Sequence, residues 1–286
     1  MVIGSHTFDP GAGDSCDGGV STVSRFNSSP LVQSVANLTM NGVNVGTSQY
    51  INGFRRAEFW SSIGGSSSYQ NGLSFTTAAE VSVSTGSAGI TYASGCNLLG
   101  IVSNSSLDSF LRTTLIPSLT SSGVISPTKF ALFLLRNVVQ STSYPPSVSH
   151  CCVLGYHSAA GSPVQTYGVM EWDTTGDFGA GVADGAVASH EIAEWMDDPL
   201  GNNPTPAWGN VGQVSGCQGN LEVGDPLSGT LVAFTMNGKT YHMQELGFFS
   251  WYFNSQGTAS LGAGGKFSSN GKFSGPSKAC PPGGTY

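Results

Sequence analysis

The sequence predicts an α/β fold of the mixed α+β kind, built as a single domain over residues 1–286. Residues 129–139 form a nearly continuous apolar run, which is typical of a central strand buried on both faces. Residues 106–119 and 184–198 have the spacing and end signals of helices. Because strand and helix patterns are mixed and no internal repeat is present, we expect one mixed domain.

The first part of the chain carries fewer regular patterns. Residues 1–50 are rich in Gly, Ser, Asn and Asp, and we expect an irregular N-terminal wrap pinned by Cys16. Residues 54–60 predict a short helix, and the alternation over 73–84 predicts strands. A catalytic-type core is expected over residues 51–253.

The middle of the chain holds the clearest elements. The helix at 106–119 is amphipathic and should end near Pro117. Its apolar residues lie three and four positions apart: Leu107, Phe110, Leu111 and Leu115. After the central strand, residues 151–157 and 164–172 predict a hairpin, because a Gly- and Pro-containing turn joins them.

The last third begins with the helix at 184–198, which Pro199 should stop. Residues 201–219 are predicted to be a long loop. Strands are expected at 231–235 and 240–245. Residues 254–286 are rich in Gly and Ser and predict an irregular tail.

Charge and composition exclude several functions. Only 9% of the residues are charged, and the net charge is -7 without a cluster of Lys or Arg. A nucleic-acid partner is therefore not expected. No stretch is long and apolar enough for a membrane span. The Gly- and Ser-rich surface favours a secreted, extracellular protein, which we expect to be a monomer.

The six cysteines are spaced far apart and contain no CxxC pair. Such spacing favours disulfides and an oxidising compartment, although 15 pairings are possible. If Cys151 and Cys152 lie on a strand, their side chains face opposite sides, so we expect them to pair with different partners.

Acidic residues are concentrated in one part of the chain. Residues 171–225 contain ten of the seventeen Asp and Glu residues, whereas residues 137–238 contain no Lys or Arg. Converging carboxylates repel each other, and no basic side chain nearby in the sequence can neutralise them. A bound cation would resolve this repulsion.

The segment His190-Glu191-x-x-Glu194 predicts where this cation binds. Residues four apart share a helix face, so His190 and Glu194 could both reach one metal ion, while Glu191 would lie beside its water. His nitrogen and carboxylate oxygen are normal Zn²⁺ ligands. For the third ligand, Glu222 is the first choice and Asp225 the second, followed by Asp198.

This arrangement predicts a zinc-dependent hydrolase acting on a peptide or protein substrate. Zn²⁺ would activate a water, and Glu191 would act as general base. Two carboxylate ligands make the metal less electrophilic than three histidines do, so a harder ion is an alternative. Ca²⁺ is a second candidate, because Asp173, Asp177 and Asp184 lie among glycines, although a polar surface loop is the favoured interpretation of these residues.

Four stretches of the chain resemble the plant EXORDIUM, or phosphate-induced protein, family and its bacterial relatives. They are Cys152-Val-Leu-Gly-Tyr156-His157-Ser158, Ala188-Ser-His190-Glu-Ile-Ala-Glu194-Trp-Met-Asp-Asp198-Pro199, Ala207-Trp208 and Glu222-Val-Gly-Asp225. The resemblance covers roughly residues 130–253. It implies a zincin-like mixed sheet with the active-site helix beside it, loops pinned by disulfides, and an extracellular protein. It supports the metal site more than a particular reaction.

Other candidate residues accompany this site. His157 could stabilise the transition state or bind the metal, or it could be a packed strand residue. Tyr167, Trp172 and Trp195 are the candidate substrate-binding residues. Residues 166–172 could offer a sheet edge to an extended peptide, or they could be an ordinary paired strand. His242 is expected to be structural.

The main alternative is a non-catalytic, metal-stabilised extracellular protein that binds a cell-wall glycan or a protein partner. The two functions differ at Glu191, because only an enzyme needs this carboxylate for turnover.

Overall fold

The computed structural model describes residues 1–13, 15–63, 69–76, 80–93, 95–253, 260–261, 266–278 and 280. Two compact units divide the chain. The first contains Met1–Arg25 and Thr76–Glu191, and the second contains Phe26–Phe75 and Ile192–Tyr286. The division falls inside helix α6 (Ala186–Asp197), so both units share this helix. The single domain inferred from the sequence stays a prediction.

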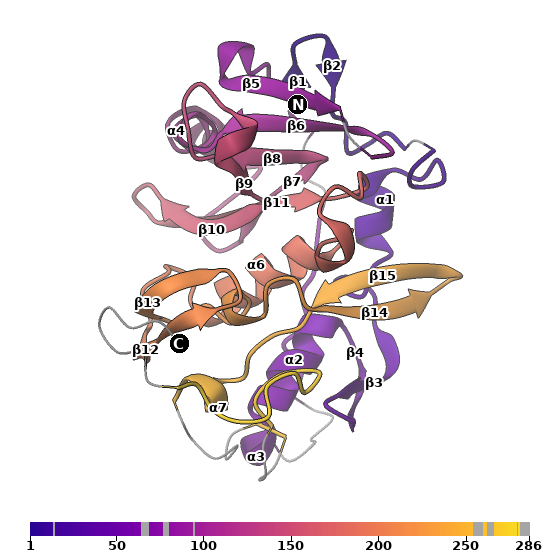
Figure 1. Ribbon diagram of the computed structural model, residues 1–286, viewed down its shortest axis with the longest axis vertical. Coiled ribbons are helices and arrows are strands. Elements are labelled where there is room, and N and C mark those ends of the chain that lie inside the picture. Colours follow the sequence, from indigo (N-terminus) through magenta and orange to yellow (C-terminus); the bar gives the residue numbers. More distant parts are fainter. Residues whose placement is uncertain are drawn as a thin grey trace. The chain divides into compact units, whose positions relative to one another are not determined.

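The first unit is built on two mixed sheets (Figure 1). One has the order β5-β6-β8-β9, with β6 and β8 parallel, and the other has the order β10-β11-β7, with β11 and β7 parallel. Their strands are β5 (Gly89–Ala93), β6 (Leu98–Ser103), β7 (Ala131–Arg136), β8 (Val138–Ser141), β9 (Cys151–Val153), β10 (Gly155–Ala160) and β11 (Gln165–Trp172). The mixed α+β class is therefore confirmed. The predicted hairpin is present as β10–β11, but its first strand begins at Gly155 rather than at residue 151, because residues 151–153 form β9 of the other sheet.

The long strand predicted at 129–139 is instead two strands that belong to different sheets. Asn137, with a φ of 51°, separates β7 from β8. Its N–H donates to the carbonyl of Trp172 at 3.2 Å, and its own carbonyl accepts from the N–H of Gly100 at 2.8 Å. Asparagine tolerates this left-handed conformation, so one residue can bend an apolar run that otherwise resembles a single strand.

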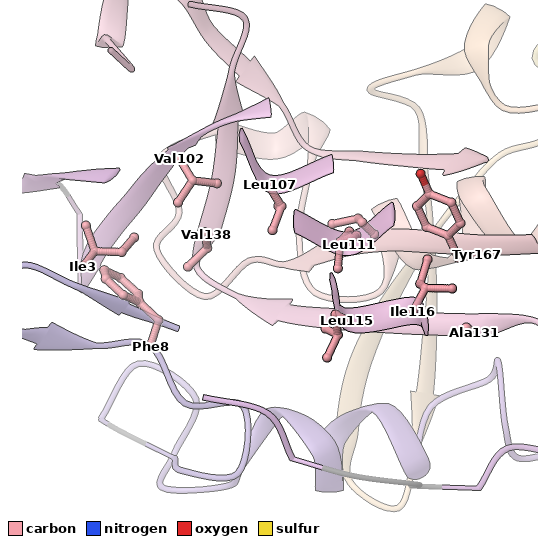
Figure 2. Close-up of a cluster of buried hydrophobic side chains, with 11 residues drawn as sticks. Ile3, Phe8, Val102, Leu107, Leu111, Leu115, Ile116, Ala131, Val138 and Tyr167 are labelled. Carbon is pink, nitrogen blue, oxygen red and sulfur yellow. The ribbon is translucent and has the colours of Figure 1, made fainter. Parts of the chain in front are cut away.

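The predicted amphipathic helix at 106–119 is confirmed, but it has three parts. These are α4 (Asn104–Phe110), the π-helical η2 (Leu111–Leu115) and α5 (Ile116–Ser121). Pro117 lies in the first turn of α5 rather than at the end of the helix, a position at which its missing N–H is tolerated. Figure 2 shows the apolar face of this helix beside side chains of β7, β8 and β11.

The N-terminal segment is more regular than predicted. Short strands β1 (Val2–Ile3) and β2 (His6–Thr7) pair with each other, and helix α1 spans Thr22–Asn27. A bulged hairpin follows, made by β3 (Val35–Met40) and β4 (Val43–Ser48). The strands predicted over 73–84 are absent from the described part of that range, where only Ser84 makes an isolated bridge.

In the second unit, α2 (Tyr50–Glu58) and α3 (Trp60–Ile63) confirm the short helix predicted near residues 54–60. Phe54 is fully buried and stacks on Phe248, with ring centroids 5.5 Å apart. Phe248 is the residue directly before the short helix α7 (Phe249–Tyr252). Aromatic stacking thus ties α2 to the C-terminal part of this unit.

Two hairpins complete the second unit. The pair β14 (Leu231–Met236) and β15 (Lys239–Gln244) was predicted, and Asn237 and Gly238 both have positive φ in its two-residue turn. The loop predicted at 201–219 is wrong, because β12 (Pro204–Val211) and β13 (Val214–Asn220) form a bulged hairpin there. Bulges at its glycines erase the alternation that would mark strands.

Short 3-10 turns connect these elements: η1 (Gly86–Ala88), η3 (Val148–His150), η4 (Gly179–Gly181) and η5 (Asp225–Leu227). Much of the predicted 254–286 tail lies outside the described residues. Within the part of the chain that the structure describes, no helix has the length and apolar character needed to cross a bilayer.

The six cysteines form three pairs at disulfide distance: Cys16 with Cys96, Cys151 with Cys152, and Cys217 with Cys280. The first and third pairs join residues 80 and 63 positions apart. Loop closure of that length stabilises a fold by about 4 kcal/mol per bridge. The different partners predicted for Cys151 and Cys152 are wrong, because these residues pair with each other across a local irregularity in β9.

Candidate metal centre

Helix α6 carries the predicted site and is almost entirely buried. Besides Ser189 and Asp197, which pairs with Arg55, its buried polar residues are His190, Glu191 and Glu194, whose exposed fractions are only 6%, 5% and 3%. Burying ionisable groups costs several kcal/mol per ion unless charges or ligands compensate. The helix therefore places three costly side chains in the interior, and the predicted helix at 184–198 is confirmed.

The three side chains lie together on the helix. His190, Glu191 and Glu194 each offer one ligand atom, and these atoms lie within 4.8 Å of one another. Nε2 of His190 is 4.0 Å from Oε1 of Glu191. An imidazole nitrogen and carboxylate oxygens at this separation could hold a metal ion. Because all three belong to one helix, its backbone fixes their relative positions.

Strand β10 packs against the face of α6 that carries Glu191. Gly155 lies so close that a Cβ atom there would be 2.6 Å from Cγ1 of Val187 and 3.0 Å from Cγ of Glu191. Two residues along the strand, Nδ1 of His157 lies 3.4 Å from Oε2 of Glu191. The strand thus brings His157 to the carboxylate predicted to act as a base.

Within the second unit, Glu194 holds the segment that follows β13. Its Oε1 accepts hydrogen bonds from the backbone N–H groups of Gly224 at 3.0 Å and Asp225 at 3.2 Å. This contact brings Glu222 beside Glu194. Asn220 donates to Oε1 of Glu222 at 2.6 Å, and the hydroxyl of Tyr252 donates to its carbonyl.

The electrostatics of Glu222 are unfavourable without a cation. Burial raises its pKa to about 10, with further contributions from the nearby carboxylates of Glu194 and Asp225. A carboxylic acid with such a pKa is protonated at neutral pH. A divalent cation would reverse this preference, because it stabilises the ionised form of every carboxylate that it contacts.

The hydrogen bonds separate the candidates for the third ligand. The oxygens of Asp198 accept from the N–H groups of Asn202 and Asn203, both at 2.8 Å. Those of Asp225 accept from the side-chain amides of Gln213 and Gln218. Both oxygens of each of these carboxylates accept a hydrogen bond, whereas Glu222 accepts one from Asn220 at Oε1 alone, which favours Glu222 as the third ligand.

Other predicted residues lie elsewhere. Tyr167 and Trp172 have exposed fractions of 0% and belong to the interior, so neither presents a surface to a substrate. Trp195 is half-buried. Tyr167 and Trp172 are buried because almost every residue of β11 is buried and the strand pairs with β10 on one side and β7 on the other. Residues 166–172 therefore offer no sheet edge, and the edge strands of this sheet are β10 and β7.

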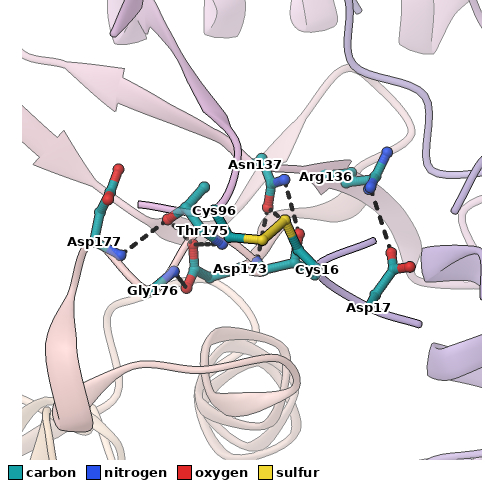
Figure 3. Close-up of a disulfide and its surroundings, with 10 residues drawn as sticks. Cys16, Asp17, Cys96, Arg136, Asn137, Asp173, Thr175, Gly176 and Asp177 are labelled. Carbon is teal, nitrogen blue, oxygen red and sulfur yellow. Dashed lines mark hydrogen bonds and ion pairs between the residues drawn. A yellow bond between two sulfur atoms is a disulfide. The ribbon is translucent and has the colours of Figure 1, made fainter. Parts of the chain in front are cut away.

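The acidic loop after β11 is held by its own hydrogen bonds. Asp173 accepts hydrogen bonds from its own loop, from Thr175 and Gly176 (Figure 3). Among the described residues, Asp173, Asp177 and Asp184 do not form a group with metal-ligand spacing. Figure 3 shows this loop beside the disulfide of Cys16 and Cys96. The carbonyl of Thr175 accepts a hydrogen bond from the N–H of Cys96 at 3.2 Å.

Two contributors to the site could not be inferred from spacing alone. Gly155 matters because it has no side chain, and only the packing of β10 on α6 reveals this. Arg55 forms an ion pair with Asp197, in the last turn of α6, although 142 positions separate the two residues. The same guanidinium also pairs with Glu58 at 3.1 Å.

Comparison of the chain with known protein families, with curated protein sequences and with solved structures found no match. The candidate metal centre therefore rests on the residues and contacts described above.

Proposed function

We propose that the protein is a secreted, zinc-dependent hydrolase that cleaves peptide bonds. His190 and Glu194 of α6 would hold the metal together with Glu222. The observation that carries the proposal is the burial of His190, Glu191 and Glu194 within ligand distance of one another on one helix. A zincin-like fold and kinship with the EXORDIUM family are part of the proposal.

The donor set fits a catalytic metal. One imidazole and two carboxylates leave one position of a tetrahedral site open. Bound Zn²⁺ would polarise the substrate carbonyl and lower the pKa of water. The raised pKa of Glu222 supports the proposal, because a protonated carboxyl cluster becomes a ligand set once a cation supplies the missing charge.

The chain's own residues would perform the proton transfers. Glu191 accepts the proton of the attacking water and passes it to the leaving amine. His157, which contacts Glu191, stabilises the developing negative charge by donating a hydrogen bond. The backbone edge of β10, which pairs only with β11 among the described strands, could align an extended peptide by strand addition.

Extracellular localisation is supported by the three cysteine pairs, since disulfides persist in oxidising compartments. The low content of charged residues agrees with this localisation. Both are consistent with a secreted enzyme that acts on peptide.

Glu191→Gln tests the reaction. Loss of the general base should lower peptide turnover by about a hundredfold or more, while zinc content stays unchanged. The measurement is cleavage of a mixed peptide library by the zinc-loaded protein, with bound zinc quantified in parallel. Glu80→Gln, which changes an exposed carboxylate, is the matched control.

Full turnover in Glu191→Gln would overturn the assignment of the base. If the wild-type protein binds zinc but cleaves no peptide, the metal-stabilised binding protein replaces the enzyme as the better account.

A further inference from the structure

The pair Cys151 and Cys152 lies in a β-bulge on β9, the edge strand of the β5-β6-β8-β9 sheet (Figure 1). On β8, the neighbours Gln140 and Ser141 face Val153 and Cys151, so Cys152 is an extra residue without a partner in the ladder. Side chains of adjacent strand residues normally point to opposite faces. A bond between two adjacent cysteines therefore requires such a departure from regular pairing.

This pair differs from the other two in what it connects. Cys16–Cys96 and Cys217–Cys280 close loops with separations of 80 and 63 residues, whereas Cys151 and Cys152 are one residue apart. A bridge between neighbours closes only the small ring of the two residues and restricts little of the unfolded chain. It holds no distant segments together, and Cys152 is exposed to solvent.

The bulge is close in the chain to the candidate metal centre. Only Leu154 separates β9 from β10. The carbonyl of Leu154 accepts from the N–H of Glu171 at 3.1 Å. Gly155, the next residue, lies against Glu191, and His157 contacts the same carboxylate.

Because Leu154 alone lies between the bulge and β10, a change in the backbone of the bulge is passed to Gly155, the first residue of β10. The packing of Gly155 on α6 leaves no slack, since a Cβ atom there would already be 2.6 Å from Val187. A small shift of the strand therefore changes the geometry at Glu191.

We propose that Cys151–Cys152 is a thiol–disulfide exchange site for a dithiol reductant. Its reduction disables the hydrolytic site by loosening the packing of β10 on α6. The catalytic part of this inference rests on the proposed function. The conformational part does not.

The dithiol reductant supplies the electrons and protons that the exchange needs. A thiolate of the dithiol attacks Sγ of the exposed Cys152, the bond between the two sulfur atoms breaks, and Cys151 leaves as a thiolate that takes up a proton. The second thiol of the reductant then displaces Cys152. Two electrons and two protons pass to the protein, and the reductant leaves as its own disulfide.

Graded dithiothreitol treatment tests this proposal, with alkylation and mass mapping to identify which cysteines are reduced. When Cys151 and Cys152 are reduced and the other two pairs are intact, peptide turnover should fall about tenfold to a hundredfold, because a small misplacement of a catalytic group has this effect. Hydrogen exchange of residues 151–160 should accelerate. Zinc content should be unchanged, since the proposed ligands lie outside β9 and β10.

Cys151→Ala/Cys152→Ala should reproduce the reduced state without reductant, and reoxidation should restore the wild-type protein. Ser149→Ala, an exposed residue of the same segment, is the matched control. Unchanged exchange of residues 151–160 after reduction would overturn the proposal. Failure of the wild-type protein to bind zinc or cleave peptide would instead count against the proposed function, and the exchange measurement would still decide the conformational part.

Discussion

Burial sets the chemistry of single residues in this chain, and Glu58 shows this away from the candidate metal centre. Its carboxylate is completely buried, pairs with Arg55 at 3.1 Å and accepts the N–H of Phe249 at 3.2 Å. Burial raises the pKa of Glu58 to about 7 despite the attraction of Arg55. Folding therefore favours the protonated form of this side chain.

The raised pKa makes stability depend on pH. Glu58 contributes fully below its unfolded value of 4.5, and the contribution is lost as pH rises towards about 7. Between these values, the free energy of unfolding of the wild type should fall by about 3 kcal/mol relative to Glu58→Gln. Urea unfolding of both proteins at a series of pH values measures the difference, and parallel pH profiles would show that Glu58 does not titrate in this way.

Gly155 makes the packing of β10 on α6 testable. In Gly155→Ala the new methyl group would meet Val187 and Glu191, and such overpacking costs about 1–3 kcal/mol. Peptide turnover should fall further than stability alone explains, because Glu191 is displaced. Gly275→Ala places its methyl group in open space and is the control for thermal unfolding and turnover.

The sequence could predict the helical part of the site but not all of its surroundings. His190, Glu191 and Glu194 are grouped by helix periodicity, which needs no tertiary information. Whether Tyr167 and Trp172 are exposed depends on which elements cover β11, and that is a property of the whole fold. Their burial could not be inferred from local spacing.

Among the elements, the junction between β7 and β8 depends on one side chain. Asn137 is buried, and its amide exchanges hydrogen bonds with Thr174 at 2.8 and 2.9 Å. This contact holds the segment after β11 beside the bend. The junction thus links two sheets and the start of the acidic loop.

Asn137→Ala should lower the free energy of unfolding by about 3 kcal/mol, from the positive φ and the lost hydrogen bonds. Asn37→Ala is a useful comparison, since Asn37 also has a φ of 51° but is exposed. It should cost about 1 kcal/mol. Equal losses in chemical unfolding would mean that the contact with Thr174 contributes nothing.

Elements with strong periodicity were predictable, and elements built on glycine were not. The helices at 104–121 and 186–197 follow their apolar spacing. The β12–β13 hairpin contains Gly209 at a φ of 153° and Gly216 at a φ of 83°, and its register is broken. Because these glycines make bulges, the strands lack the alternation by which sequence identifies them.

At the scale of the whole molecule, the Cys16–Cys96 bridge should be a major source of stability in the first unit. Cys16→Ala/Cys96→Ala removes a crosslink over 80 residues and should cost about 4 kcal/mol. Thermal unfolding monitored by calorimetry checks this. A melting temperature equal to that of the wild type would show that the N-terminal segment is held by other contacts.

The charge distribution of the whole chain leads back to the metal. Ten of its seventeen acidic residues lie within residues 171–225. Glu191 and Glu194 are buried, and Glu222 is half-buried beside Glu194. In a protein with so few basic residues, a cation is the simplest compensating charge.

The most direct test of the metal centre is the zinc content of the purified protein beside His190→Ala, with His242→Ala as the control histidine on β15. The proposed site predicts about one equivalent of zinc in the wild type and in His242→Ala, and its loss in His190→Ala. Absence of zinc and of any other transition metal from all three proteins, or full retention in His190→Ala, would contradict it.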